Sequence, residues 1–275
     1  MPARLHHERI ARSDAPIPSQ WLLLTHGMFG AGSNWRGIAR KVNERRPEWG
    51  VVLVDLRQHG RSEPGTPPHT VAACAEDLGA LIDQLRGELG TIAAIGGHSF
   101  GGKVAIATRS LVDVAQTWVL DSSPSLRDLR DDPTSALAEL ELLERLPRTW
   151  AKRDEFVAAV VAAGHSLPLA QWLGMNVVPE GDAYVLRLDT TALRAMIDDY
   201  CAVDLWDALL DPARGAVEMV VAEQSRTVST ADRARLVQAP PHIHTHMIPA
   251  GHWLHIEAPA AVVDLLATRL AAGDA

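Results

Sequence analysis

Gly97-His98-Ser99-Phe100-Gly101 is the part of the sequence that says most about the fold. It has the form G-x-S-x-G and joins an apolar run at residues 91–95 to an amphipathic segment at residues 102–111. A serine in such a tight strand-to-helix turn has a strained backbone, and small neighbours let the flanking segments approach each other. The pattern predicts a serine hydroxyl held out at a helix N-terminus, where free backbone N–H groups favour negative charge. A glycine-rich turn that only packs helix on strand is the alternative interpretation.

Similar apolar runs occur on both sides of this turn. They are continuous in Val, Ile and Leu, which is typical of strands buried on both faces. Helical patterns separate them, so the chain predicts an α/β fold with a mostly parallel central sheet and helices on both faces. Residues 5–11 predict an additional antiparallel edge strand. The other expected strands are residues 21–24, 51–54, 91–95, 117–120, 216–221 and 243–248.

One region interrupts this alternation. Residues 125–211 contain several helical patterns and no convincing buried strand. We therefore expect a helical cap inserted between two strands of the sheet. The core is expected to comprise residues 1–124 and 212–275. No low-complexity linker separates the two parts, which predicts that they belong to one folding unit.

Length and composition restrict the class of protein. A chain of 275 residues suits one large α/β domain with an insertion, and 47% hydrophobic with 22% charged residues is typical of a globular protein. The net charge of −8 argues against nucleic acid as a partner. Two cysteines, Cys74 and Cys201, stand in no metal-ligand spacing and indicate a reducing cytoplasm. We find no secretory signal and no apolar stretch of about 20 residues, so no membrane partner is expected.

A second motif, His26-Gly27-Met28-Phe29-Gly30, follows the first of the buried runs. A tetrahedral intermediate of acyl transfer needs two N–H donors aimed at its oxygen. Phe100, the residue after the serine, supplies one donor, and Met28 is well placed to supply the other. We expect these two amides to form an oxyanion hole. An ordinary flexible glycine loop is the alternative interpretation.

A base for the serine is expected in Gly251-His252-Trp253, after the last strand. An imidazole, with a pKa near 6.5, suits proton transfer close to neutral pH. His252 lies between a strand and the C-terminal helix, and we prefer it to His255. Three other histidines alternate along the preceding strand without a matching carboxylate or cysteine nearby, which indicates a polar strand face rather than a metal site. These are His242, His244 and His246.

The order of these motifs resembles the α/β-hydrolase superfamily over nearly the whole chain. Residues 55–62, Asp-Leu-Arg-Gln-His-Gly-Arg-Ser, are similar to its D-x-R-x-x-G-x-S stretch. The resemblance implies that this stretch supports the site from an adjacent loop. For Asp55 and Arg57 we prefer a structural ion pair over a direct part in catalysis.

The carboxylate partner of the histidine has two candidates. A triad needs an acid on the far imidazole nitrogen, and in most α/β-hydrolases it follows the strand after the cap. The matching segment here, residues 220–228, contains Glu223 but no aspartate, and the position best aligned with the usual acid is nearer Ser225. Asp121, at the end of the pre-cap strand, lies on the same edge of the sheet as the serine and can reach the histidine.

Several stretches together resemble the bacterial YbfF-type carboxylesterases. They are D-L-R-x-H-G-R-S, G-H-S-x-G-G-K, V-L-D-S-S-P and G-H-W-x-H-x-E-x-P, with a serine where the late acid usually stands. This resemblance implies Asp121 as the acid and Ser225 as an auxiliary hydrogen-bonding partner near the histidine. Ala222-Glu223-Gln224-Ser225 departs from the usual G-G-x-S, so Glu223 stays an alternative acid.

These motifs predict a serine hydrolase that acts through an acyl-enzyme. Ser99 would attack an acyl carbonyl while His252 takes its proton, and water would release the acyl group. We expect no metal and no organic cofactor. A serine at this position argues against haloalkane dehalogenase and epoxide hydrolase chemistry, which need an aspartate nucleophile.

The expected substrate is a small-molecule ester or thioester with a small to medium apolar acyl group. Leu, Val, Ala and Trp residues of the cap, Trp150, Trp172 and Trp206 among them, suit such a group. A carboxylesterase is the preferred function. A thioesterase, amidase, perhydrolase or C–C bond hydrolase would share the triad, and a non-catalytic ligand receptor would share the fold. The oligomeric state is not predicted.

Overall fold

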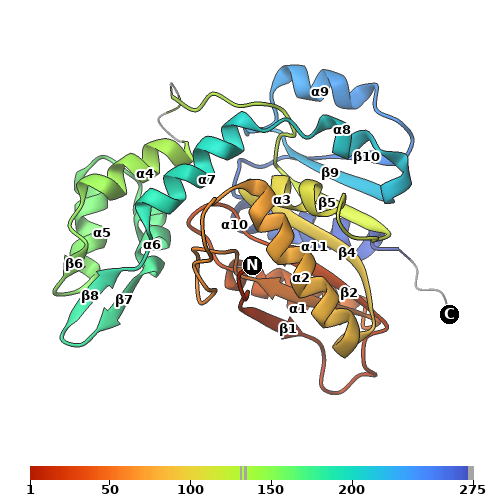
Figure 1. Ribbon diagram of the computed structural model, residues 1–275, viewed down its shortest axis with the longest axis horizontal. Coiled ribbons are helices and arrows are strands. Elements are labelled where there is room, and N and C mark those ends of the chain that lie inside the picture. The colour runs from red at the N-terminus through yellow and green to blue at the C-terminus, as the bar shows by residue number, and fades with distance from the viewer. Residues whose placement is uncertain (131, 133–134, 272–275) are drawn as a thin grey trace.

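The computed structural model describes residues 1–130, 132 and 135–271 and is built on a seven-stranded sheet in the order β1-β3-β2-β4-β5-β9-β10 (Figure 1). All neighbours pair in parallel except β1, which pairs antiparallel with β3. The α/β prediction and the antiparallel edge strand are confirmed. The strands are β1 (His7–Ile10), β2 (Gln20–Thr25), β3 (Trp49–Val54), β4 (Thr91–His98), β5 (Gln116–Leu120), β9 (Ala216–Ala222) and β10 (Ile243–Ile248).

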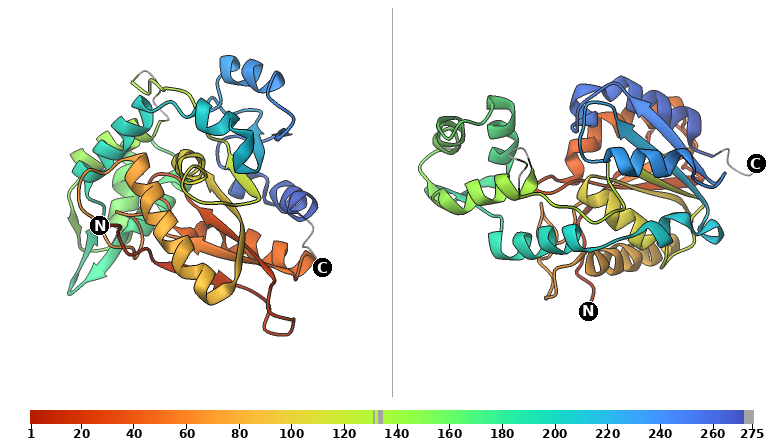
Figure 2. Two further views of the ribbon diagram at one scale, coloured as in Figure 1. Left: turned by 45° about the vertical axis from the view of Figure 1, so that its right-hand side comes forward. Right: turned by 90° about the horizontal axis from the view of Figure 1, so that it is seen from above.

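Alternating side chains of each strand enter two different cores. In β2, Leu23 packs with α2 and α3, whereas Leu22 and Leu24 pack with α1 and α11 on the other face of the sheet. Figure 2 shows the sheet between these two layers of helices. The helices are α1 (Arg36–Arg45), α2 (Val71–Leu89), α3 (Phe100–Thr108) and α11 (Pro259–Arg269). Burial on both faces explains why the strands have continuous apolar sequences.

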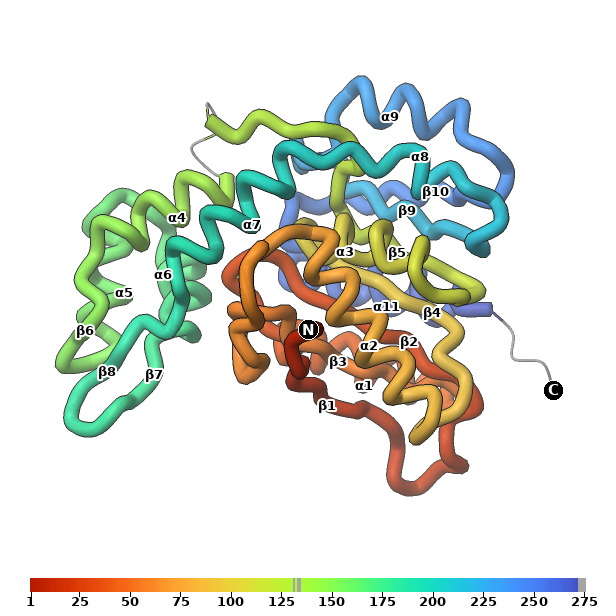
Figure 3. Tube along the Cα trace, in the orientation of Figure 1, coloured from red at the N-terminus to blue at the C-terminus, as the bar shows by residue number. Residues whose placement is uncertain are grey.

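The described residues between β5 and β9 form five α-helices, in the region where the sequence shows several helical patterns. The helices up to residue 202 project to one side of the main sheet in Figures 1 and 3, whereas the last one packs against β5 and β9. The helices are α4 (Ala136–Arg145), α5 (Arg153–Ala162), α6 (Leu167–Leu173), α7 (Thr190–Ala202) and α8 (Trp206–Leu210). We call this part of the chain the cap. The division into a core and a cap at residues 125–211 stays a prediction, and residues 131, 133–134 and 272–275 within those ranges lie outside the described residues.

The cap contains short strands that the helical patterns of the sequence do not predict. They form an antiparallel sheet in the order β6-β8-β7. Its strands are β6 (Thr149–Trp150), β7 (Val177–Glu180) and β8 (Ala183–Leu186). They are only two to four residues long and mostly exposed or half-buried, so they lack the long apolar run that marks the strands of the main sheet.

A buried lysine ties the cap to the core. The Lys103 ammonium on α3 donates to the backbone oxygens of Ser125 (2.7 Å), Tyr200 (2.6 Å) and Val203 (2.7 Å). Burial lowers the pKa of Lys103 to about 8. These carbonyls lie where the chain enters the cap and where α7 ends. The Lys103 side chain therefore fixes both of these segments against α3, the helix that follows Ser99.

The histidines near the last strand meet a carboxylate that the sequence pattern does not reveal. His244 Nδ1 lies 3.0 Å from Glu218 Oε1, and His246 Nε2 lies 2.6 Å from Glu218 Oε2. Residue 218 is on the neighbouring strand β9, directly opposite His244. His242 precedes the strand, with Nε2 3.4 Å from the Leu209 oxygen. Within residues 1–130, 132 and 135–271, no group of three or more His, Cys, Asp and Glu side chains is arranged to hold a metal ion. Over the same ranges, no helix is both long and apolar enough to span a membrane.

Candidate active site

Ser99 stands alone between the end of β4 and the start of α3, with φ 54° and ψ −119°. This conformation is strained for a residue with a side chain. The two glycines of the motif make it accessible, because a Cβ on Gly97 would lie 2.1 Å from the Gly101 oxygen and one on Gly101 would lie 2.5 Å from the His26 oxygen. The Ser99 amide donates to the Leu120 oxygen at 3.0 Å. The local sterics therefore match the turn predicted from G-x-S-x-G.

Asp121 follows β5 and is fully buried, with φ 44°. Its Oδ2 lies 2.6 Å from His252 Nδ1, and its Oδ1 accepts from the Ala222 amide at 3.1 Å. Both oxygens are thus hydrogen-bonded, which offsets the burial of a carboxylate. The contact places the imidazole proton on Nδ1 and leaves Nε2 as the basic nitrogen. His252 lines the same cavity as Ser99.

The segment after β9 differs from the sequence-based expectation. Glu223 is exposed, and the carboxylate hydrogen-bonded to His252 is that of Asp121. The Ser225 hydroxyl accepts from the Thr227 amide at 3.1 Å. The hydroxyl beside the histidine is instead Thr227 Oγ1, 3.1 Å from His252 Nδ1. The sequence analysis missed Thr227, whose only signal is its place in the same loop, two residues after Ser225.

Two further histidines surround His252. His98 Nε2 lies 2.7 Å from the His252 oxygen and donates to it. Burial holds the pKa of His98 well below its ordinary value, and burial beside His252 lowers the pKa of His255 to about 4. Both rings are therefore neutral near pH 7. His255 also packs against Trp35, with ring centroids 5.1 Å apart. His252 is the member of this cluster that has a carboxylate partner, which supports the choice of His252 over His255.

The predicted oxyanion-hole residues lie on two loops beside Ser99. Phe100 is the first residue of α3, so its amide has no acceptor inside the helix. Met28 lies in the turn of residues 27–30, which the Gly30 amide closes by donating to the Gly27 oxygen at 3.1 Å. Within the described residues, neither the Met28 amide nor the Phe100 amide donates a hydrogen bond to a backbone oxygen of a turn or loop. Both N–H groups are thus free to bind an oxygen atom.

The predicted ion pair between Asp55 and Arg57 is wrong, because Arg57 pairs with another carboxylate. The Arg57 guanidinium binds Asp77 on α2, with Nε–Oδ2 and Nη2–Oδ1 distances of 2.6 and 2.8 Å. The Asp55 carboxylate instead accepts from the Gly32 amide at 2.7 Å and the Arg61 amide at 3.0 Å. The stretch is structural, as expected, but its two charges point to different elements.

Residues 22–265 match the sequence model of the Alpha/beta hydrolase family. The chain belongs to this family. The sn-1-specific diacylglycerol lipase ABHD11 of Danio rerio is 27% identical, over 90% of this chain and 78% of that protein. Esterase YbfF of Escherichia coli is 26% identical, over 88% of this chain and 89% of that protein. A solved marine microorganism esterase shares the fold, with a TM-score of 0.79 and 24% identity over 95% of this chain and 97% of that one.

The hydrolase has a cavity of about 450 Å³ in front of Ser99. Trp172 and Trp253 line it, with ring centroids 4.4 Å apart, as do Leu129 and Ala136 from the cap. Of the cap tryptophans singled out in the sequence, only Trp172 reaches this cavity. Trp150 packs on Phe156, and Trp206 belongs to the core. The lining is also partly polar, with Arg127, Ser135 and Glu139 from the cap.

Glu139 of α4 is buried at the wall of this cavity, and burial raises the pKa of its carboxyl from 4.5 to about 8. The folded protein therefore holds a proton that the unfolded chain releases above pH 4.5, so the free energy of unfolding falls as pH rises from 4.5 to about 8. Glu139→Gln should remove this penalty. We expect the variant to gain stability over wild type by a few kcal/mol at pH 9 and by almost nothing at pH 4, at about 1.4 kcal/mol per pKa unit.

Thermal unfolding at several pH values checks this expectation. Glu141→Gln is the matched control, because Glu141 lies on the same helix with an exposed side chain. A stability difference between Glu139→Gln and wild type that does not grow with pH would show that Glu139 is ionised in the folded hydrolase.

Proposed function

We propose that this chain is a carboxylic ester hydrolase with Ser99 as nucleophile, His252 as general base and Asp121 as the acid. The observation that carries the proposal is the 2.6 Å contact between buried Asp121 and His252 Nδ1, beside a serine in a strained strand-to-helix turn on the same cavity. Relatives described as an esterase and as a lipase add support.

In the proposed reaction, the Ser99 hydroxyl oxygen attacks the acyl carbon while His252 Nε2 takes its proton. The amides of Met28 and Phe100 bind the oxyanion, and the ester C–O bond then breaks as His252 returns the proton to the departing alcohol. Water, deprotonated by the same imidazole, attacks the acyl carbon of the Ser99 ester. The bond from that carbon to the Ser99 oxygen breaks as His252 returns the proton to this oxygen, and the acid is released. Asp121 stabilises the imidazolium that forms in both steps. Every proton is carried by the protein or by water.

The proposed substrate is an ester with a small to medium acyl group. A cavity of about 450 Å³ is large enough for such a group, and Trp172 and Trp253 offer it an apolar wall. The polar cap side chains that line the cavity provide contacts for an alcohol part that carries oxygen atoms. The cytoplasmic location expected from the sequence stays a prediction.

Hydrolysis of p-nitrophenyl acetate, butyrate, octanoate and laurate tests this proposal. We expect turnover that is highest for one of the shorter chains, and mass spectrometry should find a fluorophosphonate adduct on Ser99. An adduct without turnover of any of these esters would favour another acyl class. Neither turnover nor an adduct would overturn the proposal and favour a ligand receptor.

Thr227→Val should lower kcat about fivefold, because it removes one hydroxyl contact worth about 1 kcal/mol at His252 Nδ1 while Asp121 still binds that nitrogen. Steady-state kinetics with p-nitrophenyl butyrate checks this value. Ser225→Ala removes only the hydroxyl that accepts from the Thr227 amide and should have a smaller effect. A larger loss in Ser225→Ala than in Thr227→Val would return the auxiliary role to Ser225.

A further inference from the structure

Phe29 has an unusual backbone conformation beside the proposed oxyanion hole. It is buried, with φ 62°, and stands third in the turn of residues 27–30. A positive φ at this turn position normally selects glycine. For an aromatic residue it is strained and persists only where the surroundings hold it. The residues around Phe29 must therefore hold its backbone in this conformation.

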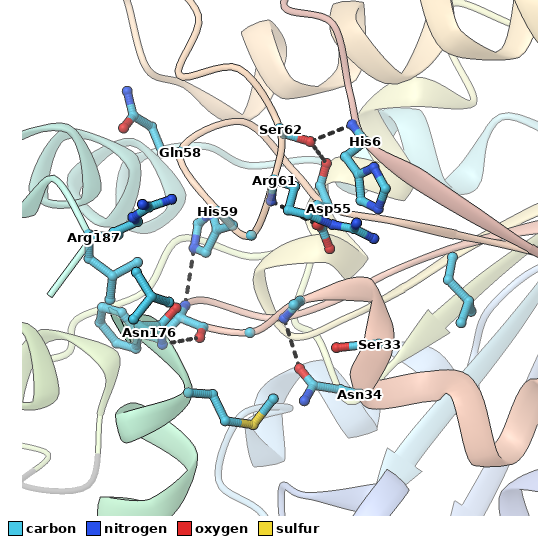
Figure 4. Close-up of a pocket in the computed structure, with 18 of the residues that line it drawn as sticks. His6, Ser33, Asn34, Asp55, Gln58, His59, Arg61, Ser62, Asn176 and Arg187 are labelled. Atoms are coloured by element: carbon cyan, nitrogen blue, oxygen red, sulfur yellow. Dashed lines mark hydrogen bonds between the residues drawn. The ribbon is translucent and has the colours of Figure 1, made fainter. Parts of the chain in front are cut away.

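Side chains from two separate parts of the protein hold the backbone of Phe29 (Figure 4). Its amide donates to His59 Nε2 at 3.1 Å, and its oxygen accepts from Asn176 Nδ2 at 2.9 Å. His59 lies in the loop after β3, whereas Asn176 ends the 3-10 helix η2 (Gly174–Asn176) in the cap. The Phe29 ring also packs edge-on against Trp172 of the cap, with centroids 6.2 Å apart. The cap thus holds both the backbone and the ring of Phe29.

The His59 side chain is fixed in the state that accepts this hydrogen bond. Its Nδ1 lies 2.9 Å from the Arg57 oxygen and donates to it, which leaves a lone pair on Nε2. Burial, with His26 nearby, lowers the pKa of His59 to about 3. The ring is therefore neutral over the range in which a serine hydrolase works, and its hold on the Phe29 amide does not vary with pH there.

The conformation of Phe29 determines where the Met28 amide points. The Gly27 oxygen accepts from His26 Nδ1 at 2.7 Å and from the Gly30 amide at 3.1 Å. In a trans peptide the next N–H, that of Met28, points the opposite way from this oxygen. The Gly30 amide reaches the Gly27 oxygen only while the turn keeps its shape, and that shape includes the positive φ of Phe29.

We propose that Asn176 and His59 are positioning residues that hold Phe29 in its strained conformation and so keep the Met28 amide turned toward Ser99. The cap thereby completes the oxyanion hole through one side-chain amide. This role rests on the proposed function, since it concerns the oxyanion of the same reaction. Asn176 is half-buried and also lines a second cavity, of about 790 Å³, so water can reach its side chain (Figure 4).

Asn176→Asp tests this role with almost no change of shape. The variant places a carboxylate oxygen against the Phe29 oxygen, so the hydrogen bond that holds the turn is lost and the two oxygens repel each other. We expect kcat to fall by roughly 10–100-fold and KM to change by less than about threefold, because the oxyanion forms only in the transition state. Affinity for a boronic acid that mimics the tetrahedral intermediate should fall with kcat.

The pH dependence separates positioning from a general structural effect. A protonated carboxyl at position 176 can donate to the Phe29 oxygen as the amide does. The ratio of variant to wild-type kcat should therefore rise as pH falls toward 4, because any pH effect common to both proteins cancels in the ratio. Asn176→Ala, which neither donates nor repels, should lose less activity than Asn176→Asp and show no such rise.

Arg187→Gln is the control, because Arg187 lines the same cavity from the cap and its nearest carboxylate, that of Glu180, is 3.7 Å away. It should keep wild-type kcat. Wild-type kcat in both Asn176 variants, or a ratio that is flat with pH, would overturn the positioning role while leaving the esterase proposal intact. A wild type that neither hydrolyses esters nor forms a fluorophosphonate adduct would overturn both.

Discussion

In Ser99→Ala, kcat for p-nitrophenyl butyrate should fall by roughly 10⁵–10⁶ relative to wild type, the loss typical of removing a triad nucleophile. Alanine keeps the Cβ, so the backbone strain at φ 54° should be the same in both proteins. Only the hydroxyl is lost. Activity that remains should come from substrate binding and the oxyanion hole, which still favour attack by water. Steady-state kinetics over long incubations measures the residual rate.

Ser110→Ala is the matched control for this experiment, because Ser110 follows the same helix and is exposed. It should retain wild-type kcat. Circular dichroism and thermal unfolding should be the same for Ser99→Ala and wild type. A Ser99→Ala protein with near wild-type activity would show that esters are cleaved elsewhere or by another mechanism, and the proposed function would fail.

The sequence predicts best those features that local sterics and burial determine. The strands of the main sheet are continuous apolar runs because both faces are covered, and the G-x-S-x-G turn needs its glycines because its backbones approach closely. The order of strands along the chain therefore places Ser99, Asp121 and His252 on one edge of the sheet.

Side-chain partners across long distances in sequence are what the sequence pattern does not predict. Arg57 binds Asp77 rather than Asp55 because its long side chain reaches α2, and Glu218 meets two histidines only through the pairing of β9 with β10. Thr227 rather than Ser225 lies beside His252 because of the shape of one loop. Each of these contacts depends on how separate segments lie in the folded structure, which local sequence patterns do not encode.

Backbone strain gathers at the same edge of the sheet. Among the described residues, four non-glycine residues have a positive φ. Each of them follows the carboxyl end of one of four adjacent strands, β2 to β5. They are Phe29, Gln58, Ser99 and Asp121. Strain of this kind persists where surrounding contacts impose it, and it is concentrated at functional sites. Its distribution supports the proposed site at this edge without reference to any motif.

The Asp121→Asn variant should lower kcat by about 10⁴, the loss seen when the acid of a comparable triad becomes an amide. The physical reason lies in the two hydrogen bonds of Asp121. Its Oδ1 accepts from the Ala222 amide, so an asparagine must place its oxygen there and turn its NH₂ group toward His252 Nδ1. The imidazole must then accept at Nδ1 and carry its proton on Nε2, where it cannot take the proton of Ser99.

Glu223→Gln is the matched control, because it makes the same carboxylate-to-amide change at the other candidate acid, and Glu223 is exposed. Its kcat should stay within about twofold of wild type, the effect expected of a surface change away from the reacting groups. Kinetics of both variants on one ester decides between the two carboxylates. If Glu223→Gln lost activity and Asp121→Asn kept it, the acid would lie after β9, and the loop that carries Glu223 would have to move toward His252 before reaction. The hydrogen bonds of buried Asp121 argue against that outcome, since its carboxylate already lies against His252 Nδ1, where it would stabilise an imidazolium.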